Sequence, residues 1–161
     1  MNSSYKKRME IAKRKNRRSI LIKELSRYVK VSLDSFIEDI EENDAFCKRV
    51  FNKLNSIQNK TIIKGNDLNE NIELAKERLK RIMENTNFNG DSIRVFFYRE
   101  LEIEAVKLNV NEVGTNIDKI LDIISFSSGF GDFILVGENL KLGICIERTE
   151  YYYELCSWGL E

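Results

Sequence analysis

The chain has 161 residues, of which 42% are hydrophobic and 32% charged, a composition typical of a globular domain with its own core. Histidine is absent, which excludes Ser-His-Asp and Cys-His nucleophilic catalysis, histidine general bases and histidine-ligated metals. The 26 basic and 26 acidic residues balance, but residues 1–30 contain eleven Lys and Arg and only two Glu. That segment therefore carries a net charge of +9 and the remainder −9.

The first third of the chain has the pattern of amphipathic helices. From about residue 6 to 55 apolar residues recur at helical spacing, as at Leu21 and Leu25. A break is expected near residues 31–34, with Ser32 as the N-cap of a second helix. The basic residues 6–18 precede the strongest apolar stripe, so we expect that part to project or fray.

The middle third changes from helical to strand periodicity. We expect first a connection over 55–69, with an apolar step at Ile62 and Ile63, and then a helix over 69–85. Two strands follow over 93–98 and 101–106, joined by a turn near Arg99 and Glu100. A further helix is expected over 116–125.

The last third predicts a three-stranded meander over 132–136, 141–148 and 151–158, punctuated by glycines. Two registers are possible for the final hairpin. Pairing Cys145 with Cys156 would place Glu147 directly opposite Glu154, a like-charge pair. We therefore favour a two-residue turn at Thr149–Glu150.

Together these elements predict an α+β fold in which N-terminal helices pack on one face of a small, mainly antiparallel sheet formed by the C-terminal half. Residues 1–161 are expected to form a single domain. Within it, 1–30 form a basic N-terminal helix able to project, 31–90 a helical part and 91–161 the sheet.

The chain carries no motif for catalysis, cofactor binding or structural metal. No Gly-rich phosphate-binding loop is present, and Cys47, Cys145 and Cys156 show no Cys-x-x-Cys spacing. We therefore expect a protein that is not an enzyme and has no cofactor. A Mg²⁺-dependent hydrolase built of carboxylates stays an alternative, and would depend on Asp132 or Glu138.

The odd number of cysteines indicates a reducing compartment, and the N-terminus lacks the apolar core of a signal peptide. No stretch approaches the roughly 18 apolar residues of a membrane span. We expect a cytoplasmic protein that makes no membrane contact.

Two surfaces are candidates for binding a partner. The first is the basic N-terminal helix, which could contact nucleic acid or fold onto its own acidic domain; its residues are Lys6, Lys7, Arg8, Lys13, Arg14, Lys15, Arg17 and Arg18. The second is a face of the final hairpin with carboxylates and large aromatic residues, among them Glu147, Tyr152, Glu154 and Trp158. Alternatively, residues 151–153 and Trp158 pack beneath the helices.

The blocks DFILV, LGICIERTE and YYYELCSWG give residues 92–159 an outline that resembles the endings of small bacterial immunity proteins of polymorphic or contact-dependent toxins. The resemblance implies a protein that binds a cognate toxin domain, often a nuclease, and masks its active site or substrate surface. It also implies that carboxylates mimic phosphates toward a basic partner; these are Asp132, Glu138, Glu147, Glu150 and Glu154.

Overall fold

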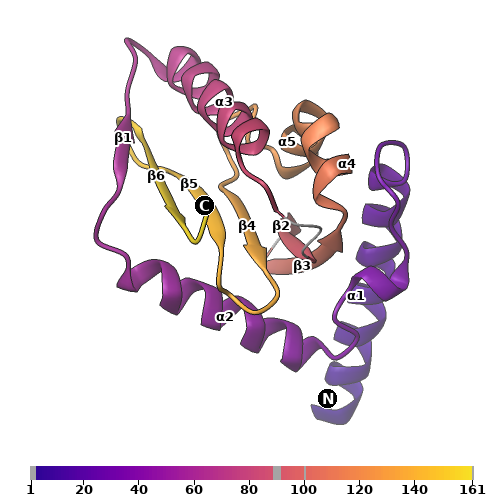
Figure 1. Cartoon of the computed structure of the whole chain (residues 1–161). Coiled ribbons are helices and arrows are strands. Elements are labelled where there is room, and N and C mark those ends of the chain that lie inside the picture. Colours follow the sequence, from indigo (N-terminus) through magenta and orange to yellow (C-terminus); the bar gives the residue numbers. More distant parts are fainter. Residues whose placement is uncertain (1–2, 89–91, 100, 161) are drawn as a thin grey trace.

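A six-stranded antiparallel sheet forms the centre of the molecule, with helices on both faces (Figure 1). The computed structural model describes residues 3–88, 92–99 and 101–160. The strands lie in the order β1-β6-β5-β4-β2-β3, with bounds β1 Thr61–Ile63, β2 Ile93–Arg99, β3 Glu102–Leu108, β4 Phe133–Gly137, β5 Gly143–Arg148 and β6 Tyr153–Trp158. The α+β class predicted from the sequence is confirmed.

Each face of the sheet has its own apolar core. Four helices cover one face: α1 Ser3–Leu25, α3 Leu68–Asn85, α4 Val110–Thr115 and α5 Ile117–Ile124. The other face is covered by α2 (Ile40–Ser56), which packs Phe46 and Val50 against Phe96 and Ile134. The prediction of helices on one face is therefore incomplete, because α2 crosses to the opposite side. No helix in the described ranges is long and apolar enough to cross a membrane.

The helix α1 is continuous, and its buried stripe begins earlier than predicted. Residues 3–10 are all exposed, whereas Arg14, Arg18, Leu21 and Leu25 are buried at helical spacing. The expected projection is thus limited to the first turns, because two arginines continue the buried stripe toward the N-terminus.

The start of the second helix differs from the prediction. Ser32 precedes only a short 3₁₀ turn, η1 (Leu33–Ser35), and Phe36 then enters the core in an extended conformation. The helix α2 begins at Ile40, where the Asp39 side chain accepts the N–H of Glu41 at 2.8 Å. Because Phe36 is buried in an extended segment between the two helices, α2 begins after it. The prediction that Ser32 caps the second helix is therefore wrong.

The predicted connection over 55–69 contains an edge strand. There β1 pairs antiparallel with β6 and buries Ile63 while leaving Ile62 exposed. Strands β2 and β3 pair as the alternating pattern predicts, with Arg99 opposite Glu102. Glu100, in the predicted turn, lies outside the described residues.

The hairpin of β5 and β6 has the register that we considered unfavourable because it places two like charges opposite each other. Cys145 faces Cys156 and Glu147 faces Glu154, so the predicted two-residue turn at Thr149–Glu150 is wrong. The connection is instead closed by Thr149, which donates its N–H to the carbonyl of Tyr152 at 2.8 Å. Lys60 lies 3.7 Å from Glu154 and offsets the carboxylate pair. The side chains of the hairpin nevertheless lie on the predicted faces of the sheet. The two registers differ by two residues, and side chains two residues apart in a strand point to the same face.

Candidate functional site

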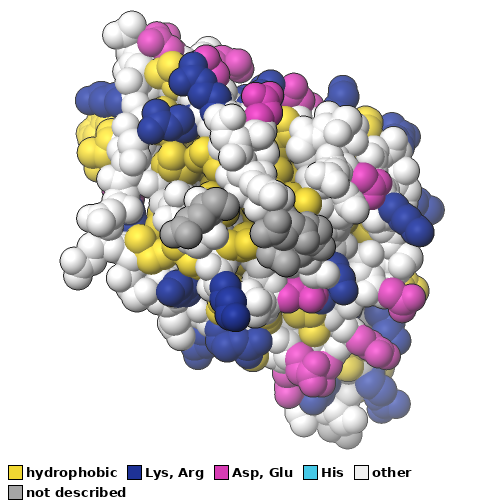
Figure 2. All heavy atoms as spheres, in the orientation of Figure 1, with side chains coloured by type: hydrophobic (Ala, Val, Ile, Leu, Met, Phe, Trp, Pro, Cys, Tyr) yellow, Lys and Arg dark blue, Asp and Glu magenta, His cyan; other side chains and the backbone are white. Residues whose placement is uncertain are grey.

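A groove of about 1360 Å³ runs between α1 and α2 at the β3 end of the sheet. Residues 7–17 of α1 form one wall, and residues 38–51, from just before α2 into that helix, form the other, called here the α2 wall. Residues 101–103 of the β2–β3 hairpin contribute the rest of the lining. Figure 2 shows Asp and Glu side chains gathered at the lower right, where Figure 1 places the beginnings of these two helices. The groove is therefore open to solvent and strongly charged.

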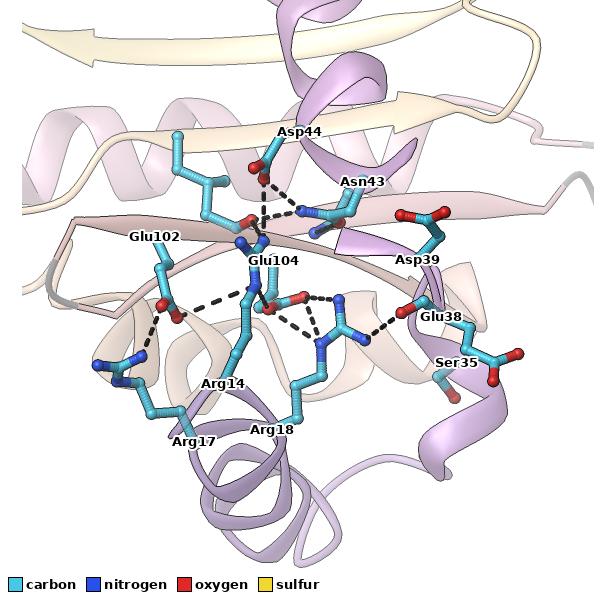
Figure 3. A network of polar contacts seen from close by, with 12 residues as sticks. Arg14, Arg17, Arg18, Ser35, Glu38, Asp39, Asn43, Asp44, Glu102 and Glu104 are labelled. Atoms are coloured by element: carbon cyan, nitrogen blue, oxygen red, sulfur yellow. Dashed lines mark hydrogen bonds and ion pairs between the residues drawn. The ribbon is translucent and has the colours of Figure 1, made fainter. Parts of the chain in front are cut away.

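Next to the groove, behind its lining residue Arg14, a buried carboxylate lies between two arginines (Figure 3). Arg14 Nε donates to Glu104 Oε1 at 2.8 Å, and Arg18 Nε donates to both Glu104 oxygens at 3.0 Å. The three side chains are only 6%, 7% and 3% exposed. Burial alone would lower the pKa of Arg14, but hydrogen bonds and charges of Glu104 and Asp44 outweigh it and raise that pKa. This network fixes α1 to β3.

Two more carboxylates, in the groove lining, are already paired. Arg14 Nη2 contacts Asp44 Oδ1 at 3.0 Å, and Arg17 Nη1 donates to Glu102 Oε1 at 2.5 Å. These ion pairs therefore stabilise the fold. A cation of a partner would gain little binding energy from Asp44 or Glu102, because both carboxylates already have arginine partners.

Asn43 closes the outer edge of the sheet beside this network (Figure 3). Its Nδ2 donates to the carbonyl of Ile103 at 2.8 Å, and its Oδ1 accepts the N–H of Ala105 at 3.2 Å. One side chain thus takes the place of a neighbouring strand along β3.

The walls of the groove have opposite charge. Exposed Lys7 and Lys13 lie on the α1 wall, while the α2 wall presents Glu38, Glu41 and Glu42. Lys7 and Glu41 are 3.6 Å apart across the groove with side chains 70% and 82% exposed, so this ion pair adds little stability. Over the whole lining, seven carboxylates outnumber five basic side chains.

Two apolar side chains line the same groove. Leu101, in the β2–β3 connection, is fully exposed. Phe51 is 36% exposed and its ring meets that of Phe96 edge-on, with centroids 5.9 Å apart. An exposed leucine and a rigidly held aromatic ring beside charged walls are typical of protein interfaces.

A smaller pocket of about 100 Å³ lies on the other side of Phe51. Folding brings together three predicted residues there: Asp132 before β4, Glu147 near the end of β5 and Glu154 near the start of β6. Only Lys60 contributes a basic side chain to the lining. Burial raises the pKa of Asp132, although the N–H and the charge of Arg148 act in the opposite direction. Because Phe51 lines both hollows, the pocket adjoins the groove at this ring.

The other predicted partner-binding residues lie elsewhere. Glu138 is 2.9 Å from Arg94 and 3.9 Å from Lys107. Glu150 and Tyr152 line a different hollow, which faces the start of α3. Folding therefore separates these residues from the acidic pocket.

Trp158 and the tyrosines differ in placement. The Trp158 ring is half-buried over Gly143, where any Cβ would lie 2.2 Å from the ring, and its Nε1 donates to the carbonyl of Leu140 at 3.0 Å. Tyr153 is fully buried against Phe126, while Tyr151 is 67% exposed. Packing thus accounts for Trp158 and Tyr153.

The predicted basic cluster is split by the fold. Arg14 and Arg18 are buried on Glu104, and Arg17 is paired with Glu102. The exposed members of the cluster are Lys6, Lys7, Arg8, Lys13 and Lys15.

The cysteines are reduced and buried, and burial is the main reason why their thiol pKa values lie above normal, about 12 for Cys47. Within the described ranges no three His, Cys, Asp or Glu side chains are placed to hold a metal ion.

Sequence reasoning missed Glu104, Asn43, Phe51 and Leu101. A signal existed for Glu104, because it shares a strand face with the apolar Val106 and Leu108 while Arg14 and Arg18 share one helix face. No comparable signal marked the other three, because their roles depend on the packing of α2 beside β3.

Comparisons with known proteins place the chain in a family without adding a characterised relative. A model described as YxiF protein matches residues 21–158, and the basic residues 6–18 precede the matched region. Comparison with curated proteins gives no match, and comparison with solved structures gives none either. Because the match extends over most of the sequence, this chain belongs to the YxiF family.

Proposed function

We propose that the protein is a cytoplasmic immunity protein that binds a cognate bacterial toxin domain stoichiometrically and masks its active site or substrate surface. The observation that carries the proposal is the acidic pocket. Asp132, just before β4, converges with Glu147 of β5 and Glu154 of β6 beside the exposed ring of Phe51. The resemblance of residues 92–159 to immunity proteins supports the same role.

The partner that suits this surface is a toxin domain with a basic face, such as the substrate-binding face of a nuclease. Carboxylates held on strand ends would occupy the positions of substrate phosphates and steer association over a distance of about 10 Å at moderate salt. Neutralisation would then need no catalytic step in this protein.

The first test is recovery of the partner. Tagged protein is used to capture material from a native lysate, with and without nuclease treatment, and the complex is analysed for stoichiometry. We expect one protein at equal molar amount that survives nuclease treatment and whose toxic activity is lost in the complex. Nucleic acid released by moderate salt, with no stoichiometric protein, would overturn the proposal.

The second test locates the interface. The variant D132N/E147Q/E154Q removes three charges from the pocket, and E73Q/E77Q/E84Q removes the same number from exposed positions on α3. We expect the first variant to slow association with the recovered toxin about tenfold or more at low salt, and the second to have little effect.

A cytosolic regulator that binds nucleic acid remains the alternative, because five of the eight basic side chains in the predicted cluster are exposed. Its affinity would fall steeply with salt and disappear when those residues are changed to Ala.

A further inference from the structure

We propose that the groove between α1 and α2 binds a polypeptide segment of the partner that carries Lys or Arg on one side and an apolar side chain next to them. The inference rests on the proposed function only in identifying that partner as a toxin. It assigns an occupant to a groove that the sequence did not indicate.

The size and lining of the groove indicate a polypeptide. Its volume of about 1360 Å³ exceeds the roughly 300–1,000 Å³ typical of small-molecule sites, which are also mostly apolar. Here twelve of the lining side chains are charged. A segment of chain can match charges spread along two helices, whereas a small molecule reaches only a few of them.

The α2 wall of the groove offers carboxylates that are free to bind a partner. Asp44 and Glu102 are already paired with arginines. By contrast, Glu38 and Glu42 make no ion pair within the part of the chain that the structure describes, and both line the groove. These two carboxylates are therefore available to cations of a partner.

The α1 wall sets the orientation of the segment. Lys7 and Lys13 outnumber Glu10 on this wall and repel a cation placed against them, so the basic side of the segment faces α2. Lys7 is held across the groove by its exposed contact with Glu41, and a partner cation can replace it there at small cost.

The apolar contact comes from Leu101. Its side chain is completely exposed, and the half-buried Ile103 and the ring of Phe51 line the same groove. An apolar partner side chain placed there would bury Leu101 without disturbing the fold, as interface anchors do.

The test uses the full-length protein labelled with ¹⁵N and a synthetic amphipathic peptide of about four helical turns, with Lys on one face and Leu on the other. Amide shifts in ¹H–¹⁵N spectra locate and quantify binding. A peptide with Glu in place of every Lys is the ligand control. The protein variants are E38K/E42K, L101S and, as a matched charge reversal on α3, E73K/E77K.

We expect the Lys peptide to shift amides of residues 38–51 and 101–103 most strongly and the Glu peptide to leave them unchanged. E38K/E42K should weaken binding at least about tenfold, and L101S about fivefold, the latter independent of salt. E73K/E77K should bind as the parent does. Equal binding of both peptides, or largest shifts outside the groove, would overturn the inference.

The two proposals fail separately. If the peptide binds the groove but no toxin is recovered, the proposed function is wrong and the groove assignment stands. If a toxin is recovered and E38K/E42K binds it as tightly as the parent, the groove assignment is wrong and the function stands.

Discussion

Glu104 is the residue on which the position of α1 depends most. It is 2% exposed and accepts hydrogen bonds from two buried arginines. The substitution E104A leaves two guanidinium groups buried without a carboxylate, so we expect a loss of about 3–5 kcal/mol in the free energy of unfolding. Chemical denaturation followed by circular dichroism measures it. A loss below about 1 kcal/mol would show that α1 is held by its leucines alone.

A control separates lost charge pairing from lost packing. Replacing the network by apolar residues in R14M/R18L/E104L removes all three buried charges together. Because burying charges is itself costly, this variant should be more stable than E104A.

Asp132 illustrates a conflict between binding and stability. Its folded-state pKa is raised, chiefly by burial, so the ionised form disfavours folding above that pKa. The penalty disappears as the pH falls through the folded pKa toward the unfolded value of about 3.9. Asn at this position can still accept the N–H of Arg148 without the charge.

We therefore expect D132N to be at least as stable as the parent near neutral pH, with the difference shrinking as the pH is lowered toward about 4. Urea titrations across this pH range give the comparison. A difference that grows on acidification would contradict the assigned direction of the pKa shift.

At the scale of elements, the outer edge of β3 depends on one side chain of α2. The substitution N43A leaves the N–H of Ala105 without its acceptor and removes one donor to the Ile103 carbonyl, which should cost about 1–3 kcal/mol. Local opening of this edge should also make the Ala105 amide exchange faster. Hydrogen exchange measured by NMR reports on that amide directly, and unchanged protection at Ala105 would argue against the edge role.

Periodicity was sufficient to predict most elements. The alternation at 93–98 and 101–106 corresponds to the hairpin β2–β3, and the glycine-separated blocks after residue 131 correspond to β4, β5 and β6. The helix predicted over 69–85 is α3, within one residue. Such patterns can be recognised from neighbouring residues alone, because the spacing of apolar side chains shows which of them face the core.

Register, short strands and helix starts depend on partners far along the chain. Glu147 can face Glu154 because Lys60, about 90 residues earlier, lies beside them. Three residues are too few to show alternation, which is why β1 was read as a connection. The sequence indicates Asp132, Glu147 and Glu154 as candidate binding residues but not that they share a pocket, and the groove depends on how two helices meet at a sheet edge.

For the whole molecule, the division of charge between residues 1–30 and the remainder is only partly neutralised by folding. Arg14, Arg17 and Arg18 are paired with Glu102 and Glu104, whereas residues 3–10 are entirely exposed. The beginning of α1 is therefore a basic arm adjacent to an acidic surface. Such an arm opposes the approach of a basic protein and favours the approach of nucleic acid.

Deleting residues 1–10 gives opposite results under the two functional hypotheses. The deletion removes Lys6, Lys7 and Arg8 together with Glu10, and residues 3–10 contribute no buried side chain, so thermal stability should change little. For a basic toxin partner we expect association to become a few times faster at low salt and the difference to vanish near 1 M salt, where charges are screened beyond about 3 Å. For nucleic acid we expect affinity and its salt dependence to fall together. Stopped-flow association rates measured across a salt series distinguish the two, because slower association with the captured protein would contradict binding through the acidic surface.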